Sequence, residues 1–297
     1  MRKLKGVLCP VDFSEVSIRA YRHALSIARQ YNAKLSVQHV VEPWRYPYAD
    51  FCVSLEHFDQ FYNTLREKSE EQLQQLVKTY SRDRDQTECV VHVWMASDSI
   101  LAYAEAQEVD LIVMGTHGRR GFDRLMLGSV TERVLRKASC PVLTVNNPLH
   151  DFIDSEKKPG PIHLSRILFC TDFSENSQRA LDYAISLAAE YAAELTLLHV
   201  LEDSPDAANV QQAIATATEQ LDKLIPPEAH SASGVKTRTI VRIGKAYQQI
   251  IQLALEAQTD LAIMAVRGRG ALDLAVFGST THRVIQFGPC PVLVVHA

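Results

Sequence analysis

The chain has 297 residues, of which 46% are hydrophobic and 22% charged. This length suits about two domains of roughly 150 residues each. The formal net charge of −4 gives no overall basic field, which argues against a nucleic-acid partner bound through phosphate contacts. Since no apolar run approaches the ~20 residues of a membrane helix, we expect a cytoplasmic protein with no membrane partner. The six cysteines show neither CxxC nor zinc-ligand spacing, so we expect buried thiols and no metal site.

Short apolar runs alternate with helical periods through the first half of the chain. In chain order, the apolar runs that have the length of a strand are 5–11, 33–41, 87–95, 109–115 and 141–145. Predicted helices follow the first four runs: one begins after Ser14, a candidate N-cap, and the others cover about 55–80, 97–107 and 128–138. Strands alternating with helices of this length predict βαβ units, and therefore a doubly wound parallel sheet.

The second half repeats the first. "VDFSE" at 11–15 returns as "TDFSE" at 171–175, and "VDLIVMGTHGR" at 109–119 returns as "TDLAIMAVRGR" at 259–269. The sequence therefore predicts two tandem α/β domains, each a five-stranded parallel sheet with helices on both faces. We expect the domains to cover 1–147 and 162–297, with a linker at 148–161 that is rich in proline and charge.

Three glycines and a serine follow the fourth predicted strand, with two and then nine residues between the glycines. Glycine is favoured where the backbone needs a positive φ or passes close to a ligand. In a doubly wound sheet, ligands bind beyond the carboxyl ends of the strands, where the strand order reverses. Gly115 and Asp12 end two such strands, and Gly128 and Ser129 open a helix whose N-terminus favours an anion. These positions predict a site for a phosphate chain.

The pattern Gly115, two residues, Gly118, nine residues, Gly128, Ser129 resembles the signature of the ATP-binding branch of the universal stress proteins. "VDFSE", "HV" at the end of the second strand and "CPVL" before the last strand resemble the same family. The resemblance covers both halves and implies a tandem member with a Rossmann-like fold, similar to adenine nucleotide alpha hydrolases. It implies that the adenosine end of ATP, or of another adenine nucleotide with or without Mg²⁺, contacts Asp12 and the backbone of Pro10, Val11 and Val40. It implies that ribose and phosphates contact Met114, Gly115, Gly118, Gly128, Ser129 and Val130.

The second half departs from this pattern at one position, because Ala265 stands where the first half has Gly115. If a positive φ is needed there, alanine costs on the order of 1 kcal/mol. If a ligand approaches closely there, the methyl group obstructs it. We therefore expect weaker nucleotide binding in the second domain. The expected contacts there are the residues equivalent to those of the first domain: Asp172, Val200, Gly268, Gly278 and Ser279.

Several functions stay open on the sequence alone. No GxxxxGK[ST] motif and no convincing catalytic set occurs, so we expect a nucleotide-binding regulatory protein of a stress response. The alternatives are a slow ATPase or phosphotransferase in which Asp12 holds a metal, and an interaction protein whose second domain holds a lipid or sugar nucleotide. Asp12 and Asp172 are also suited to capping the helices that follow them.

The resemblance also bears on assembly. It implies that "CPVLTV" and "CPVLVV" pair within the chain, which would make an internal pseudo-dimer of the two domains. An unpaired last strand would otherwise expose an edge prone to aggregation. Association of two chains into a homodimer is left open.

Overall fold

A computed structural model describes residues 4–42, 55–82, 85–116, 127–153, 159–202, 209–225, 235–266 and 278–296. The chain forms two compact units. The N-terminal unit comprises Lys3–Cys140 and Ile153–Pro161, and the C-terminal unit comprises Pro141–Phe152 and Ile162–Ala297 with the first two residues. The segment Pro141–Phe152 belongs by sequence to the first repeat, but it is part of the C-terminal unit.

The N-terminal unit contains a parallel sheet with the strand order β3-β2-β1-β4. Its strands are β1 Gly6–Pro10, β2 Lys34–Val41, β3 Thr87–Val93 and β4 Leu111–Gly115. Its helices are α1 Glu15–Tyr31, α2 Leu55–Tyr80, α3 Ala96–Ala106 and α4 Ser129–Lys137. The centres of β1 and β4 are buried, as expected for continuous apolar strands covered on both faces. The predicted α/β class is confirmed.

Helix α1 shows how local sequence sets the start of an element. Ser14 is its N-cap, with φ −70° and ψ 157°, and its hydroxyl accepts a hydrogen bond from Ser17 N at 3.3 Å. The helix ends where Asn32 takes a left-handed conformation with φ 51°. One face of α1, which includes Ala20, Ala24 and Leu25, is buried against the sheet. The predicted N-cap is therefore confirmed.

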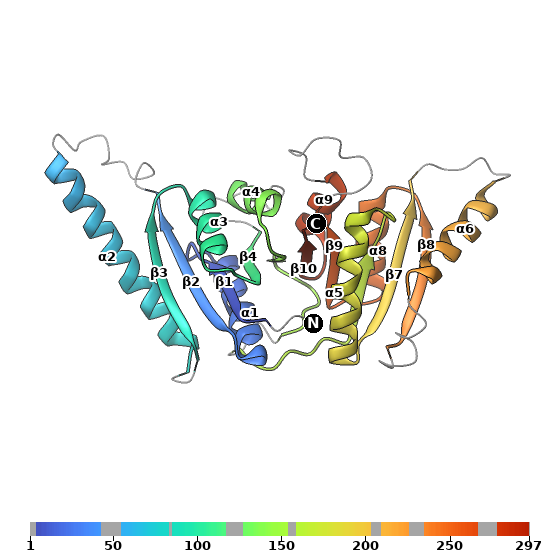
Figure 1. Cartoon of the computed structure of the whole chain (residues 1–297), viewed down its shortest axis with the longest axis horizontal. Helices are drawn as coiled ribbons and strands as arrows, with labels where there is room; N and C mark the ends of the chain where they lie inside the picture. Colours follow the sequence, from blue (N-terminus) through green and yellow to red (C-terminus); the bar gives the residue numbers. More distant parts are fainter. Residues whose placement is uncertain are drawn as a thin grey trace. The chain divides into compact units, whose positions relative to one another are not determined.

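The order of the strands reverses between β1 and β4. From β1 the chain moves to β2 and β3, and then returns to lie on the other side of β1 as β4. Right-handed crossovers put α1 and α2 on one face of this sheet and α3 on the other. Helix α1 contacts β1 and β4, α2 lies along β3, and α3 contacts β2 and α4 (Figure 1). The carboxyl ends of β1 and β4 are therefore the switch point of the sheet.

The C-terminal unit contains a sheet with the order β5-β10-β9-β6-β7-β8. Its strands are β5 Val142–Val145, β6 Arg166–Cys170, β7 Glu194–Leu201, β8 Thr237–Ile243, β9 Leu261–Ala265 and β10 Val292–Val295. Its helices are α5 Glu175–Tyr191, α6 Val210–Lys223, α8 Ala246–Glu256 and α9 Ser279–Phe287. Helix α6 lies along β8 in this unit, as α2 does along β3 in the other (Figure 1).

Strand β5 pairs antiparallel with β10, whereas the other strand pairs of this unit are parallel. Leu143 faces Leu293 in register, and the Thr144 hydroxyl donates to the Val292 carbonyl at 3.1 Å. Asn146 adds a side-chain bond to the Gly288 carbonyl at 2.9 Å. The two "CPVL" segments thus pair within one chain, as the resemblance implied.

In the described part of the chain, none of the helices combines the length and the hydropathy needed to span a bilayer.

Candidate functional site

The candidate site lies at the switch point, and Asp12 follows β1 there. Asp12 Oδ1 accepts two hydrogen bonds from Ser14, from the backbone N–H at 3.1 Å and from the hydroxyl at 2.6 Å. The Asp12 N–H donates to the Ser17 hydroxyl at 3.3 Å. Ser14 caps α1, so Asp12 instead closes the turn that leads into the helix. Capping therefore does not account for Asp12, whose carboxylate is held at the carboxyl end of β1.

The residue after Asp12 has an unusual backbone. Phe13 has φ 65°, a left-handed conformation that is rare for a bulky residue and that clusters at functional sites. Its ring packs on His39, with 4.6 Å between the ring centroids. His39 Nδ1 lies 2.7 Å from the Val11 carbonyl oxygen, which can only accept, so Nδ1 carries the proton. This contact ties the end of β1 to β2 beside Val40.

Gly115 ends β4 against the first turn of α1. A Cβ added to Gly115 would lie 3.0 Å from Val16 Cγ1 and 3.2 Å from Ser17 N. The backbone of Gly115 is not left-handed, so the positive-φ explanation of this glycine is wrong. The close approach is real, but in this structure its partner is helix α1. Met114, the residue before it, is buried in the core and so presents only its backbone here.

Gly128 and Ser129 begin α4 beside the end of β4. Gly128 is the N-cap, with φ −61°, so a positive φ does not explain this glycine either, and a glycine N-cap has no side chain with which to cap the helix. Its N–H donates to the Thr116 carbonyl at 2.8 Å, and the Thr131 hydroxyl donates to the Gly115 carbonyl at 2.8 Å. These two bonds hold the start of α4 against β4. Gly118 lies outside the described residues.

A cavity of about 460 Å³ opens at the first turn of α4, and we call it the Trp94 cavity. It contains two of the predicted phosphate contacts, Ser129 and Val130. Its remaining walls come from the ends of β2 and β3 and from α3 and α4: Glu42, Trp94, Met95, Ser97 and Arg133. Ser129 is exposed, so its hydroxyl and the start of α4 are accessible to a ligand.

The second repeat keeps most of this arrangement. Asp172 Oδ1 accepts from Ser174 N at 3.1 Å and from the Ser174 hydroxyl at 2.6 Å, and Phe173 has φ 62°. Val200 is half-buried in β7, next to His199, whose Nδ1 lies 2.9 Å from the Thr171 carbonyl oxygen. The turn after the first strand is therefore built alike in both repeats.

The second repeat differs where β9 meets α9. Ala265 replaces the glycine, and the Thr281 hydroxyl lies 3.2 Å from its carbonyl, against 2.8 Å in the first repeat. Gly278 N lies 3.4 Å from the Val266 carbonyl, against 2.8 Å for the equivalent bond. Gly278 and Ser279 begin α9 without a side-chain cap, and Gly268 lies outside the described residues.

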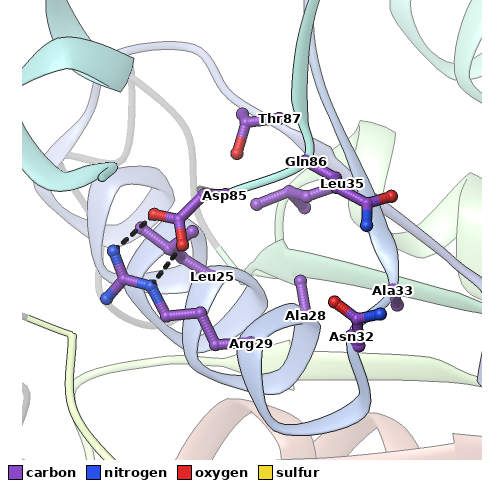
Figure 2. Close-up of a pocket in the computed structure, with 9 residues that line it drawn as sticks. All are labelled: Leu25, Ala28, Arg29, Asn32, Ala33, Leu35, Asp85, Gln86 and Thr87. Carbon is purple, nitrogen blue, oxygen red and sulfur yellow. Dashed lines mark hydrogen bonds and ion pairs between the residues drawn. The ribbon is translucent and has the colours of Figure 1, made fainter. Parts of the chain in front are cut away.

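A second cavity, of about 310 Å³, lies at the amino ends of β2 and β3 (Figure 2). Arg29 and Asp85 form a bidentate ion pair there, with Nη2 and Oδ2 2.6 Å apart and Nε and Oδ1 3.0 Å apart. Arg29 also donates to the Pro159 and Tyr80 carbonyls. Burial by itself would raise the pKa of Asp85, but the bonds from Arg29 and from the Arg82 N–H lower it below its usual range. This pair joins three segments, and it lies at the end of the sheet opposite the switch point.

The described thiols are not suited to chemistry. Burial raises the pKa of Cys9 and Cys170, and it raises that of Cys140 to about 11, so these groups stay protonated at neutral pH. Nor do the described residues bring three or more histidine, cysteine, aspartate or glutamate side chains together in a way that could hold a metal ion.

Three residues that hold the site together through hydrogen bonds to its backbone were not identified from the sequence. They are Ser17, Thr131 and His39. Each returns in the second repeat at the equivalent place, as Ser177, Thr281 and His199. That repetition of polar residues next to the motif is the signal that could have identified them.

Comparison with known proteins places this geometry in a family. The profile of the universal stress protein family matches residues 3–146 and 163–296. A universal stress protein of Methanocaldococcus jannaschii is 32% identical over 153 residues, covering 48% of this chain and 83% of that protein. One of Synechocystis is 35% identical over 138 residues, covering 46% of this chain and 88% of that protein.

A solved structure agrees in fold along the whole chain. The crystal structure of a universal stress protein from Archaeoglobus fulgidus matches 99% of this chain and 97% of that chain, with a TM-score of 0.68 and 23% identity. Each repeat matches the same family model. The chain belongs to the universal stress protein family, as a tandem of two such domains.

Proposed function

We propose that the first repeat binds ATP or another adenine nucleotide at the carboxyl ends of β1 and β4, and that binding regulates the chain. The observation that carries this proposal is the start of α4. There Gly128 and Ser129 open a helix whose N-cap residue has no side chain, at the switch point of the sheet and at the motif spacing of the ATP-binding branch. The N–H groups in the first turn of a helix and the helix dipole favour a phosphate.

The residues around Asp12 suit the adenosine end. The Asp12 carboxylate is held by Ser14, and a carboxylate has two acceptor oxygens, so it can serve the turn and a ribose hydroxyl together. The Pro10, Val11 and Val40 backbone lies on the same edge of the sheet, where a base can meet main-chain donors and acceptors. The strained Phe13 and the His39 anchor keep this edge in one conformation.

We propose regulation rather than catalysis because the sequence contains no convincing catalytic set. Hydrolysis needs a positioned base and usually a metal with protein ligands. Mg²⁺ is usually bound through one or two carboxylates together with the phosphates of a nucleotide, so an ion at this site would be held largely by those phosphates. The charge of the bound phosphates and the volume of the nucleotide would then favour one conformation of the chain.

Matched variants test the proposal. Asp12→Asn should weaken ATP binding to the full chain roughly tenfold, since a charged hydrogen bond is lost, in isothermal titration calorimetry. The equivalent Asp172→Asn change in the second repeat should leave the tighter site unchanged. Equal effects of both changes, or no binding of ATP to the unaltered chain, would refute the proposal. Steady phosphate release that is abolished in Asp12→Ala would instead favour the slow ATPase.

A further inference from the structure

Trp94 is the most unusual side chain near the proposed site. It follows β3 with 63% of its surface exposed, beside Met95 at 39%. Its N–H donates to the Val41 carbonyl at 3.1 Å, and Ala96 N donates to Glu42 Oε1 at 3.1 Å. Both Trp94 and Met95 line the Trp94 cavity, which also contains Ser129 and Val130.

The second repeat shows that the fold does not need this ring. Gly244 takes the place of Trp94, and its N–H donates to the Leu201 carbonyl at 3.0 Å. Ala246 N donates to Glu202 Oε1 at 2.9 Å, which repeats the bond between Ala96 and Glu42. The same backbone bonds therefore form without an indole. A ring left mostly in water adds little burial energy, so its position in a cavity wall points to a ligand.

The charges around the cavity favour an uncharged occupant. Glu42 accepts the hydrogen bond from Ala96, and Arg133 Nη2 lies 2.9 Å from Asp98 Oδ1. One carboxylate and one guanidinium thus line the cavity, and each already has a partner of suitable charge or polarity. A neutral planar group that can stack on Trp94 and donate to Glu42 suits these walls better than a further phosphate does.

We propose that the Trp94 cavity binds the second nucleoside of a dinucleoside polyphosphate. This inference rests on the proposed function, because the phosphate chain would lie at the start of α4 and the first nucleoside beside Asp12. Ser129 and Val130 belong to both the cavity and the proposed phosphate contacts, so a ligand leaving that helix end enters the cavity directly. The second base stacks on Trp94, and its exocyclic amine donates to Glu42.

Calorimetry on the full chain tests this assignment with ATP and diadenosine tetraphosphate as probes. Diadenosine tetraphosphate should bind roughly tenfold more tightly than ATP, since stacking of one base on an aromatic ring is worth roughly 5- to 150-fold in affinity. Trp94→Ala should remove this advantage and leave the ATP affinity unchanged. Phe287→Ala, which removes an exposed aromatic ring of the second repeat, is the matched control and should change neither affinity.

Fluorescence gives a second, independent readout. The chain has two tryptophans, so Trp44→Phe leaves Trp94 as the only one. Diadenosine tetraphosphate should quench its emission, and ATP should not. If ATP binds but diadenosine tetraphosphate binds no more tightly, or if ATP quenches the Trp94 emission equally, the assignment of the second nucleoside is overturned while the proposed function stands. If neither probe binds, the proposed function fails and the assignment fails with it.

Discussion

The Gly115→Ala variant adds one methyl group where β4 meets the first turn of α1. An ideal Cβ there would lie 3.0 Å from Val16 Cγ1, 3.1 Å from the Val16 carbonyl carbon and 3.2 Å from Ser17 N. The Val16 side chain can rotate away, but the two backbone atoms can move only if the helix start moves. Overpacking of this kind costs about 1–3 kcal/mol of unfolding free energy. Urea unfolding followed by circular dichroism should show that loss.

The same displacement reaches the proposed site through Ser17, whose hydroxyl accepts from the Asp12 N–H at 3.3 Å. We therefore expect Gly115→Ala to weaken ATP binding as well, roughly tenfold if one such bond is lost. The reciprocal change, Ala265→Gly, removes the corresponding methyl group from the second repeat and should strengthen its nucleotide binding in calorimetry. A Gly115→Ala chain with unchanged unfolding midpoint and ATP affinity would refute this steric account of the glycine.

Three further variants test other parts of the structure. Ser14→Ala removes the N-cap of α1 and should lower the unfolding free energy by about 1 kcal/mol in urea; no change would mean that Ser14 does not cap in solution. Asp85→Asn breaks the pair with Arg29 and should cost about 3 kcal/mol. Because the folded pKa of Asp85 is lowered, its contribution is present above the unfolded value of about 3.9 and is lost as the pH falls through the folded pKa. Acid titration of stability should therefore be shallower in Asp85→Asn, and equal slopes would contradict this. Cys140, whose pKa burial raises to about 11, should resist a thiol reagent at pH 8 until the chain unfolds, and rapid labelling of the native chain would contradict that burial.

Much of the fold could be predicted because local signals and the repeat agree. The long helix predicted at 55–80 is α2 Leu55–Tyr80, and the helix predicted after Ser14 begins at Glu15. Continuous apolar runs predicted strands that are buried on both faces, and "CPVLVV" predicted β10. These features depend on residues that are close in sequence, so the pattern is sufficient.

What could not be predicted depends on residues far apart in the chain. Gly115 avoids a contact with Val16, which belongs to another element, and no local pattern reports that distance. The sequence also could not tell that Trp94 would be exposed in a cavity wall, because the same residue type is common in cores. Likewise, β5 belongs by repeat to the first half but by contact to the C-terminal unit.

The most direct measurement is a calorimetric titration of ATP into full-length Gly128→Val, beside the unaltered chain and the equivalent Gly278→Val. The proposed site predicts that Gly128→Val abolishes or strongly weakens binding, because a branched side chain would stand at the start of α4 where the phosphates lie. It predicts that Gly278→Val leaves the tighter affinity unchanged. Undiminished ATP binding by Gly128→Val would contradict the claim that the first repeat holds a phosphate chain at this helix.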